Sequence, residues 1–477
     1  MSFNSLEFLI FFPLVAVLFY ALPHRLRAPF ILIASCVFYA WTMPAYILIA
    51  FYAAGVSWVG GRAIAKASGG RRRAYTAVTA LLVFAPLMLY KYFDFFMRLL
   101  SSALGTAGLE VALPQMGLLL PVGISFYTFQ CAAYVFDMYR GKYEPEKNPM
   151  YYLLYIMFFP QLVAGPIERA NNVLLQFRQR VEFDCDRVRS GLVQMLMGVF
   201  KKVVVADRLA KAVTHVYGNP DAFGGAALAI ATLLFAVQIY CDFAGYSDIA
   251  IGCARILGIR LTKNFDAPLL ARSPSDFWDR WHISLSTWLK DYIYIPLGGN
   301  RRGFARVCLN LLAVFAISGL WHGASLTFVA WWLLNGLYMI AERIFKKNRT
   351  GKKHKFALPA AVCRIMTFLA ISFTWIFFRA DSLDSAVRVI KGIFTRMNIG
   401  ALPAAIMSLG LNKYDLLLSA AGIAAIFLLQ LAELRGISDG GLAKKPFVLR
   451  YICYTAAVAV ILFFGVYGST EFIYFRF

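Results

Sequence analysis

The feature that most constrains this chain is a series of long apolar segments, distributed from one end to the other and separated by short polar or basic stretches. Hydrophobic residues make up 60% of the 477 residues and charged residues only 15%, whereas soluble domains carry about a quarter charged residues. A membrane helix needs about 20 apolar residues, and a lipid-embedded backbone must satisfy its own hydrogen bonds. The sequence therefore predicts an all-α integral membrane protein, a polytopic helical bundle with one membrane domain over 1–477.

The number of apolar segments predicts about 11–13 membrane helices, together with re-entrant and interfacial helices. The candidate spans are 6–22, a pair within 29–60 that breaks at Pro44, 76–96, 116–136, 190–206, 225–250, two passes within 305–343, 359–379, 415–433 and 449–467. Residues 151–166 are short and contain Pro160, so they form either a broken or re-entrant segment or a short kinked span. Placing the basic loops in the cytoplasm puts residues 255–306 inside and both termini outside.

The net charge of +23 could indicate a nucleic-acid-binding protein, but the basic residues gather between apolar segments, as at 62–73 and 346–355. This distribution is typical of cytoplasmic loops facing anionic lipid, and no nucleic-acid-binding module accompanies it. Membrane lipids, rather than nucleic acid, are the expected partners. The eight cysteines include no C-x-x-C pair, so neither a disulfide framework nor a metal site is predicted. Hydrolase elbows and nucleotide-binding loops are absent from the sequence.

Residues 263–304 are too polar to span a membrane and too aromatic for a free loop. Ser273, Pro274 and Asp276 have the pattern of a helix start. From there apolar residues follow a helical period, which predicts one amphipathic helix at the cytoplasmic interface, with His282 on its apolar face.

Two Trp-His pairs, Trp281-His282 and Trp321-His322, stand out because the chain has only five histidines. A neutral imidazole is the usual proton carrier near neutral pH, and an ionisable group between apolar segments needs a reason to be there. His322 is the candidate catalytic base, although a purely structural histidine was equally compatible with residue type alone. His282 could orient substrate or stabilise an oxyanion, or could be a chemically silent interfacial residue.

Asp242 lies within an apolar segment and shares a helix face with Gln238, four residues before it. Intramembrane acids are candidate functional groups, but a helix-to-helix hydrogen bond is the first interpretation here.

Several segments together resemble the membrane-bound O-acyltransferase (MBOAT) family, in particular its bacterial polysaccharide branch, which includes the membrane subunit of alginate O-acetyltransferase. They are FFPQLVAGPIER (158–169), GVFKKVVVADRLA (198–210), QIYCDFAGYSDIAIG (238–252), FWDRWHISLSTWLKDYIYIPLGGNR (277–301), GLWHGAS (319–325) and FIYFRF (472–477). The resemblance implies a helical bundle around a funnel or tunnel through the bilayer, in the bacterial inner membrane. It implies His322 as the family histidine and His282 as the second motif position.

The resemblance also implies that an acetyl group enters from a cytoplasmic donor, acetyl-CoA or an acyl-carrier thioester, with no tightly bound cofactor. Arg301 and Arg302 could then meet donor phosphates, with Trp281, Trp321 and Asp242 as further candidate substrate contacts. The acetyl group would pass to an exported polysaccharide such as alginate through an extracytoplasmic SGNH-type partner, with polysaccharide export machinery as a possible further partner. Acylation of a lipid or protein, D-alanyl transfer from a carrier, and non-enzymatic transport are the alternatives. Hydropathy places His322 near the outer side, whereas a tunnel reachable from both faces would require it to lie deeper.

Overall fold

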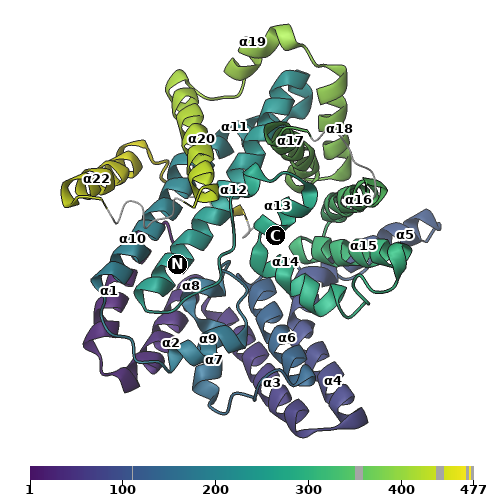
Figure 1. The fold of residues 1–477 in the computed structure, drawn as a ribbon. Coiled ribbons are helices and arrows are strands. Elements are labelled where there is room, and N and C mark those ends of the chain that lie inside the picture. Colours follow the sequence, from purple (N-terminus) through teal and green to yellow (C-terminus); the bar gives the residue numbers. More distant parts are fainter. Residues whose placement is uncertain (110, 350–357, 437–444, 469–471, 474–477) are drawn as a thin grey trace. The chain divides into compact units, whose positions relative to one another are not determined.

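The computed structural model of the protein describes residues 1–109, 111–349, 358–436, 445–468 and 472–473. All regular elements within these ranges are helices (Figure 1). Chain contacts divide them into two compact units, one comprising residues 1–195 and 249–262 and the other residues 196–248 and 263–477. The predicted all-α membrane fold is confirmed. That a single domain covers 1–477 stays a prediction.

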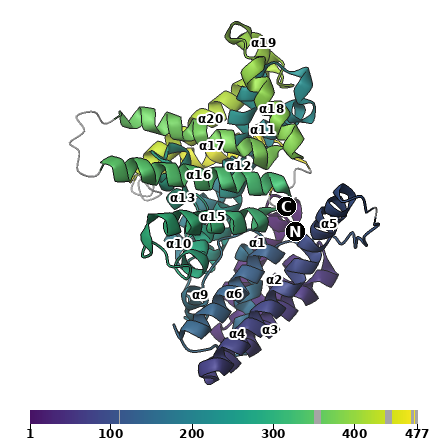
Figure 2. The ribbon, with the colours of Figure 1, turned by 90° about the vertical axis from the view of Figure 1, so that its right-hand side faces the viewer.

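The first unit contains helices from the N-terminal part of the chain. They are α1 (Leu6–Ala21), α2 (His24–Ala40), α3 (Ile47–Lys66), α4 (Gly69–Leu87), α5 (Phe93–Thr106), α6 (Ile124–Arg140), α7 (Pro149–Met157), α8 (Phe159–Leu162) and α9 (Ala170–Phe177). In Figure 2, α3, α4 and α6 lie side by side, in agreement with their mutual contacts. The predicted break at Pro44 is confirmed, since a short 3₁₀ turn, Pro44–Tyr46, separates α2 from α3.

The apolar segment 151–166 is broken rather than a simple span. Helix α7 ends at Met157, and Phe158 adopts a non-helical backbone (φ −51°, ψ 108°) before the four-residue helix α8 begins. The exposed fractions of Phe158, Phe159 and Gln161 are 1%, 0% and 1%. Protein therefore surrounds the irregular backbone, the condition under which such a segment is stable at membrane depth.

Two helices, α10 (Cys185–Val199) and α12 (Gly225–Ile256), contribute residues to both units. The second unit also contains α11 (Asp207–Gly218), α13 (Pro274–Arg280), α14 (Ile283–Leu289), α15 (Gly303–His322), α16 (Leu326–Arg349), α17 (Ala360–Arg379), α18 (Leu383–Thr395), α19 (Leu402–Met407), α20 (Lys413–Leu434) and α22 (Phe447–Phe464). The predicted two passes within 305–343 are α15 and α16, which pack against each other and, through α16, against α17 (Figure 2).

Over the described part of the chain, seven helical stretches are long and apolar enough to cross a membrane. They are 44–66, 69–106, 225–256, 303–322, 360–379, 413–434 and 447–464. The protein is therefore a multi-pass membrane protein. The other predicted spans are shorter or less apolar helices, such as the 16-residue α1 and the 17-residue α6, because apolar residues beyond a helix end had been counted with it.

Candidate active site

His322 is the last residue of α15, and aromatic rings surround its imidazole. The ring centroids of Trp321, Trp332, Trp331 and Phe378 lie 4.7, 5.0, 5.3 and 6.3 Å from that of His322. Helix α16 supplies the two later tryptophans, and α17 supplies the phenylalanine. The exposed fraction of His322 is 3%.

Two contacts meet at Nδ1 of the His322 imidazole. Nδ1 lies 2.8 Å from the backbone oxygen of Ser318, and a carbonyl oxygen can only accept. In the tautomer whose Nδ1 donates to this oxygen, Nε2 carries the lone pair. The indole N–H of Trp332 donates to Nδ1 at 3.2 Å, a contact that belongs to the other tautomer, in which Nε2 carries the hydrogen. The tautomer that donates to Ser318 has Nε2 as its basic atom, the arrangement that a general base requires.

The two glycines beside His322 allow this close packing. A Cβ atom on Gly323 would lie 2.2 Å from the Phe328 ring, and one on Gly319 would lie 2.7 Å from the Trp332 ring. Neighbouring aromatic side chains therefore occupy the space that the glycines leave, and the backbone turn after α15 stays tight.

His282 lies close to His322 because both pack against one tryptophan. The Trp321 ring centroid is 6.1 Å from that of His282 and 4.7 Å from that of His322. The other Trp-His tryptophan, Trp281, is 1% exposed and packs on Phe277 and Trp375, with centroid distances of 5.4 and 5.2 Å. The structure thus brings both predicted pairs into one buried aromatic cluster.

The helix that carries His282 differs from the prediction. The predicted start is confirmed, since Ser273 Oγ accepts from the Asp276 backbone nitrogen and Pro274 follows the cap. A single helix, however, was wrong: α13 ends at Arg280, Trp281 is extended, and His282 is left-handed (φ 44°, ψ 53°) before α14 begins. Because the chain breaks here, apolar residues of both short helices, α13 and α14, are buried. Asn264 contacts this turn and stabilises it, but no pattern in the sequence indicated that role.

Burial lowers the pKa of His282 well below its ordinary value, and the nearby His322 lowers it further. The residue lies between the candidate spans α12 and α15. Both effects disfavour the imidazolium, so His282 is neutral near pH 7.

Asp242 makes a hydrogen bond between helical segments, as expected, and the donor is a charged lysine. Its Oδ1 is 2.7 Å from Lys202 Nζ, which also lies 2.9 Å from Asp207 Oδ1. Its Oδ2 accepts from the backbone nitrogen of Ile473 at 2.8 Å. Lys202 comes from a π-helical segment, Phe200–Ala206, between α10 and α11. The sequence showed Lys202 only as part of a family-like segment and gave no sign of this pairing.

A cavity of about 700 Å³ lies in the second unit and includes Asp242 in its lining. Its other polar lining residues are Asp207, Lys211, Thr214, Gln238, Ser325, Thr327, Arg379 and Asp381. Phe328 and Phe378 also line it, and Phe378 contacts the His322 ring from α17. His322 itself is not part of the lining. Phe378 therefore lies between the cavity and the imidazole, in contact with both.

Arg301 and Arg302 do not approach the histidines along this helix. Both are exposed, and Arg302 directly precedes α15, whereas His322 ends it. At about 1.5 Å rise per residue, the two ends of the helix are about 30 Å apart.

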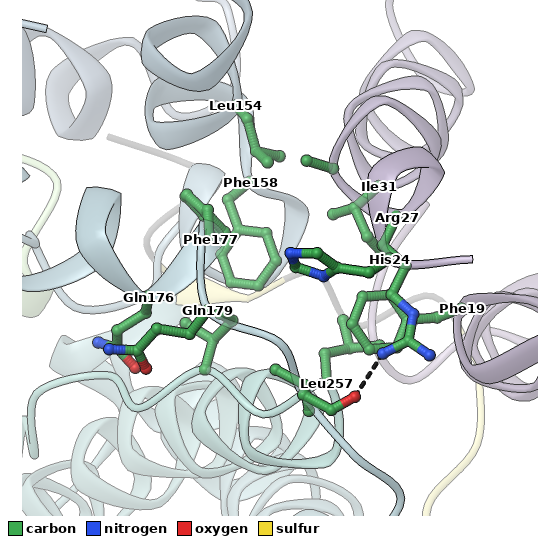
Figure 3. Close-up of a pocket in the computed structure, with 13 residues that line it drawn as sticks. Phe19, His24, Arg27, Ile31, Leu154, Phe158, Gln176, Phe177, Gln179 and Leu257 are labelled. Atoms are coloured by element: carbon green, nitrogen blue, oxygen red, sulfur yellow. Dashed lines mark hydrogen bonds between the residues drawn. The ribbon is translucent and has the colours of Figure 1, made fainter. Parts of the chain in front are cut away.

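Two of the other histidines have different surroundings. His24 lines a small pocket of about 30 Å³ in the first unit, where it points toward Phe158, and Arg27 donates to the Val181 backbone oxygen (Figure 3). His215 is exposed and contacts Phe223. His354 lies outside the described residues.

Comparison with known proteins identifies the family of the chain. The model of the MBOAT, membrane-bound O-acyltransferase family, matches residues 146–380, which include both Trp-His pairs. A probable alginate O-acetylase AlgI of Pseudomonas aeruginosa is 36% identical, over 83% of this chain and 75% of the relative. A peptidoglycan O-acetyltransferase of Helicobacter pylori is 35% identical, over 64% and 61%. A teichoic acid D-alanyltransferase of Bacillus subtilis is 29% identical, over 55% and 68%. The chain belongs to the membrane-bound O-acyltransferase family and is an O-acyltransferase.

Proposed function

We propose that the protein transfers an acetyl group from a cytoplasmic thioester donor, such as acetyl-CoA, to a hydroxyl on the outer side of the bacterial cytoplasmic membrane, for O-acetylation of an exported polysaccharide. The observation that carries the proposal is the His322 imidazole, whose Nδ1 lies 2.8 Å from the Ser318 backbone oxygen inside an aromatic enclosure. The reactive tautomer in this proposal is the one that donates to this oxygen, because it leaves Nε2 as a proton acceptor. The relatives named as alginate and peptidoglycan acetyltransferases support a polysaccharide as the final acceptor.

The proposed step needs no metal or nucleotide hydrolysis, because a thioester is already activated. The acceptor hydroxyl oxygen attacks the acetyl carbonyl carbon, so that a C–O bond forms and the C–S bond breaks. Nε2 of His322 takes the hydroxyl proton and returns it to the leaving thiolate. A base of this kind contributes about 10²–10⁴ in rate.

The cavity of about 700 Å³ is the proposed acceptor chamber. Its volume is in the range of small-molecule sites, about 300–1,000 Å³. Its hydroxyl, amide and charged side chains suit a sugar or the serine of an extracytoplasmic SGNH-type partner. In this proposal Phe378 moves when the acceptor hydroxyl approaches His322, since Phe378 lies on both the cavity wall and the imidazole.

The test measures transfer of labelled acetyl from acetyl-CoA to extracellular polymer. His322→Ala is expected to lower it by about 10²–10⁴, while membrane insertion and thermal stability stay close to those of the parent. The matched control is His215→Ala, which removes an exposed histidine outside the cluster and is expected to keep full activity. Acetylation at the parent rate in the His322 variant would refute the proposal, and labelling only by carrier-bound D-alanine would assign the alternative acyl group.

A further inference from the structure

Asn264 lies in the segment between α12 and α13 and is 1% exposed. Its side chain and backbone both contact the turn between α13 and α14. The backbone oxygen accepts from Ile283 at 3.0 Å, and Oδ1 accepts from the backbone nitrogen and hydroxyl of Ser284 at 3.2 and 2.9 Å. The same Oδ1 lies 3.2 Å from Nδ1 of His282. One amide side chain therefore holds the residues on both sides of the helix break.

These contacts determine how the amide is oriented and which tautomer His282 adopts. The Ser284 backbone nitrogen can only donate, so the atom that faces it must be the amide oxygen. Nδ2 then points to Ser247 Oγ, at 3.3 Å. Because an amide oxygen can only accept, His282 Nδ1 must be its donor, and Nε2 carries the lone pair.

The backbone conformation of His282 is strained, so neighbouring residues must stabilise it. Its left-handed conformation (φ 44°) is uncommon for a residue other than glycine and is strained. Strained residues of this kind cluster at active sites, where surrounding contacts maintain them. Here the conformation turns the imidazole toward Phe243 and Trp321, with centroid distances of 4.7 and 6.1 Å, and Trp321 in turn contacts His322.

We propose that Asn264 is a positioning residue of the acyl-transfer site: it acts through His282, fixing the orientation of that imidazole and keeping its hydrogen on Nδ1, so that Nε2 is the atom offered to the reaction. This inference rests on the proposed function and adds to it a residue that contacts neither donor nor acceptor. Its effect is on the rate and pH dependence of the reaction.

The test compares Asn264→Ala and Asn264→Asp in the full-length protein, reconstituted in vesicles with acetyl-CoA. Asn264→Ala removes the acceptor, so the imidazole can rotate and change tautomer. We expect kcat to fall about 10- to 100-fold, part of the 10²–10⁴ of general acid–base catalysis, with KM for acetyl-CoA within about twofold. Asn264→Asp keeps the acceptor and adds negative charge, which stabilises imidazolium. We expect it to retain more activity than the alanine variant and to move the acid limb of the pH–rate profile to higher pH.

The side chains around His282 allow the shift of the acid limb in Asn264→Asp to be assigned to this imidazole. Among the described residues, His322 is the ionisable side chain whose charge contributes to the pKa of His282, while Asn264, Ser284, Phe243 and Trp321 are neutral neighbours. A profile measured in a His282→Gln background should lose the shift caused by Asn264→Asp, because the titrating partner is gone.

Asn310→Ala is the matched control for loss of a buried amide. Asn310 is 2% exposed, lies on α15 nearer the Arg302 end, and donates to the Gly299 backbone oxygen at 3.2 Å. It should lower thermal stability without moving the pH–rate profile. An unshifted profile for Asn264→Asp, or a fall in kcat for Asn264→Ala no larger than for Asn310→Ala, would overturn the inference. If the alanine variant does not fold, the profile of Asn264→Asp decides. Activity of His322→Ala at the parent rate would instead refute the proposed function.

Discussion

At the scale of single residues, the candidate site contains two imidazoles, each with an oxygen atom close to its Nδ1. For His322 that atom is the Ser318 backbone oxygen, four residues earlier on the same helix. For His282 it is the side chain of Asn264, on a different segment. Both residues are nearly fully buried. Burial lowers the pKa of His282, so protonation of this imidazole costs free energy.

The buried state of His282 predicts a pH dependence of stability. Its folded pKa is below the unfolded value of about 6.5, so the unfolded chain binds a proton more readily. The stabilisation is therefore fully present above about pH 6.5 and decreases as the pH falls toward the folded pKa, by up to about 1.4 kcal/mol per pH unit. Thermal unfolding in detergent from pH 7.5 to 5 should show a steeper loss for the parent than for His282→Gln. Parallel curves would contradict this.

At the scale of elements, the π-helical segment Phe200–Ala206 turns two consecutive lysines toward acids on α12. Lys201 pairs with Asp248 at 2.6 Å, and Lys202 with Asp242 at 2.7 Å. The pairs differ in burial: the side chains of Lys202 and Asp242 are 1% and 3% exposed, those of Lys201 and Asp248 15% and 21%. Close approach of the helices is possible because Gly245 faces the Gly198 backbone oxygen, where a Cβ atom would lie at 2.7 Å.

This difference predicts unequal effects of two adjacent substitutions. Lys202→Met leaves Asp242 and Asp207 buried without their shared cation, and breaking a buried pair in this way costs about 3–5 kcal/mol. Lys201→Met removes the more exposed pair and should cost clearly less. Unfolding midpoints in denaturing detergent measure both. Equal losses, or a larger loss for Lys201→Met, would show that the ion pair at Asp242 is not the one that stabilises the contact between the segment Phe200–Ala206 and α12.

At the scale of the whole molecule, α15 runs from an exposed basic position to the residues that line the cavity. Exposed Arg302 precedes the helix, and the cavity residue Ser325 follows its end. The helix is one of the stretches long and apolar enough to cross a membrane, and at about 30 Å it matches the hydrocarbon thickness. The two positions should therefore lie on opposite sides, with the donor phosphates proposed at one and the acceptor chamber at the other.

Cysteine labelling tests this arrangement. In a background whose eight native cysteines are replaced, a membrane-impermeant maleimide added to intact cells should label Ser325→Cys. It should label Arg302→Cys only after the membrane is permeabilised. The cysteine-free parent is the control for nonspecific reaction. Labelling of both variants in intact cells would place the two ends of α15 on one side and remove the basis for a reaction across the membrane.

The sequence by itself determined the all-α membrane fold, the break at Pro44, the hairpin around His322 and the start of α13 at Ser273. These features depend on local apolar length, proline geometry and capping, all of which are written in consecutive residues. Tertiary contacts decided the features that do not depend on consecutive residues. The helix stops at Trp281 because Asn264, eighteen residues before His282, provides acceptors for the turn, and the aromatic enclosure of His322 takes Phe378 from a distant helix. Contacts between segments far apart in the chain have no periodic signal, so only folding reveals them.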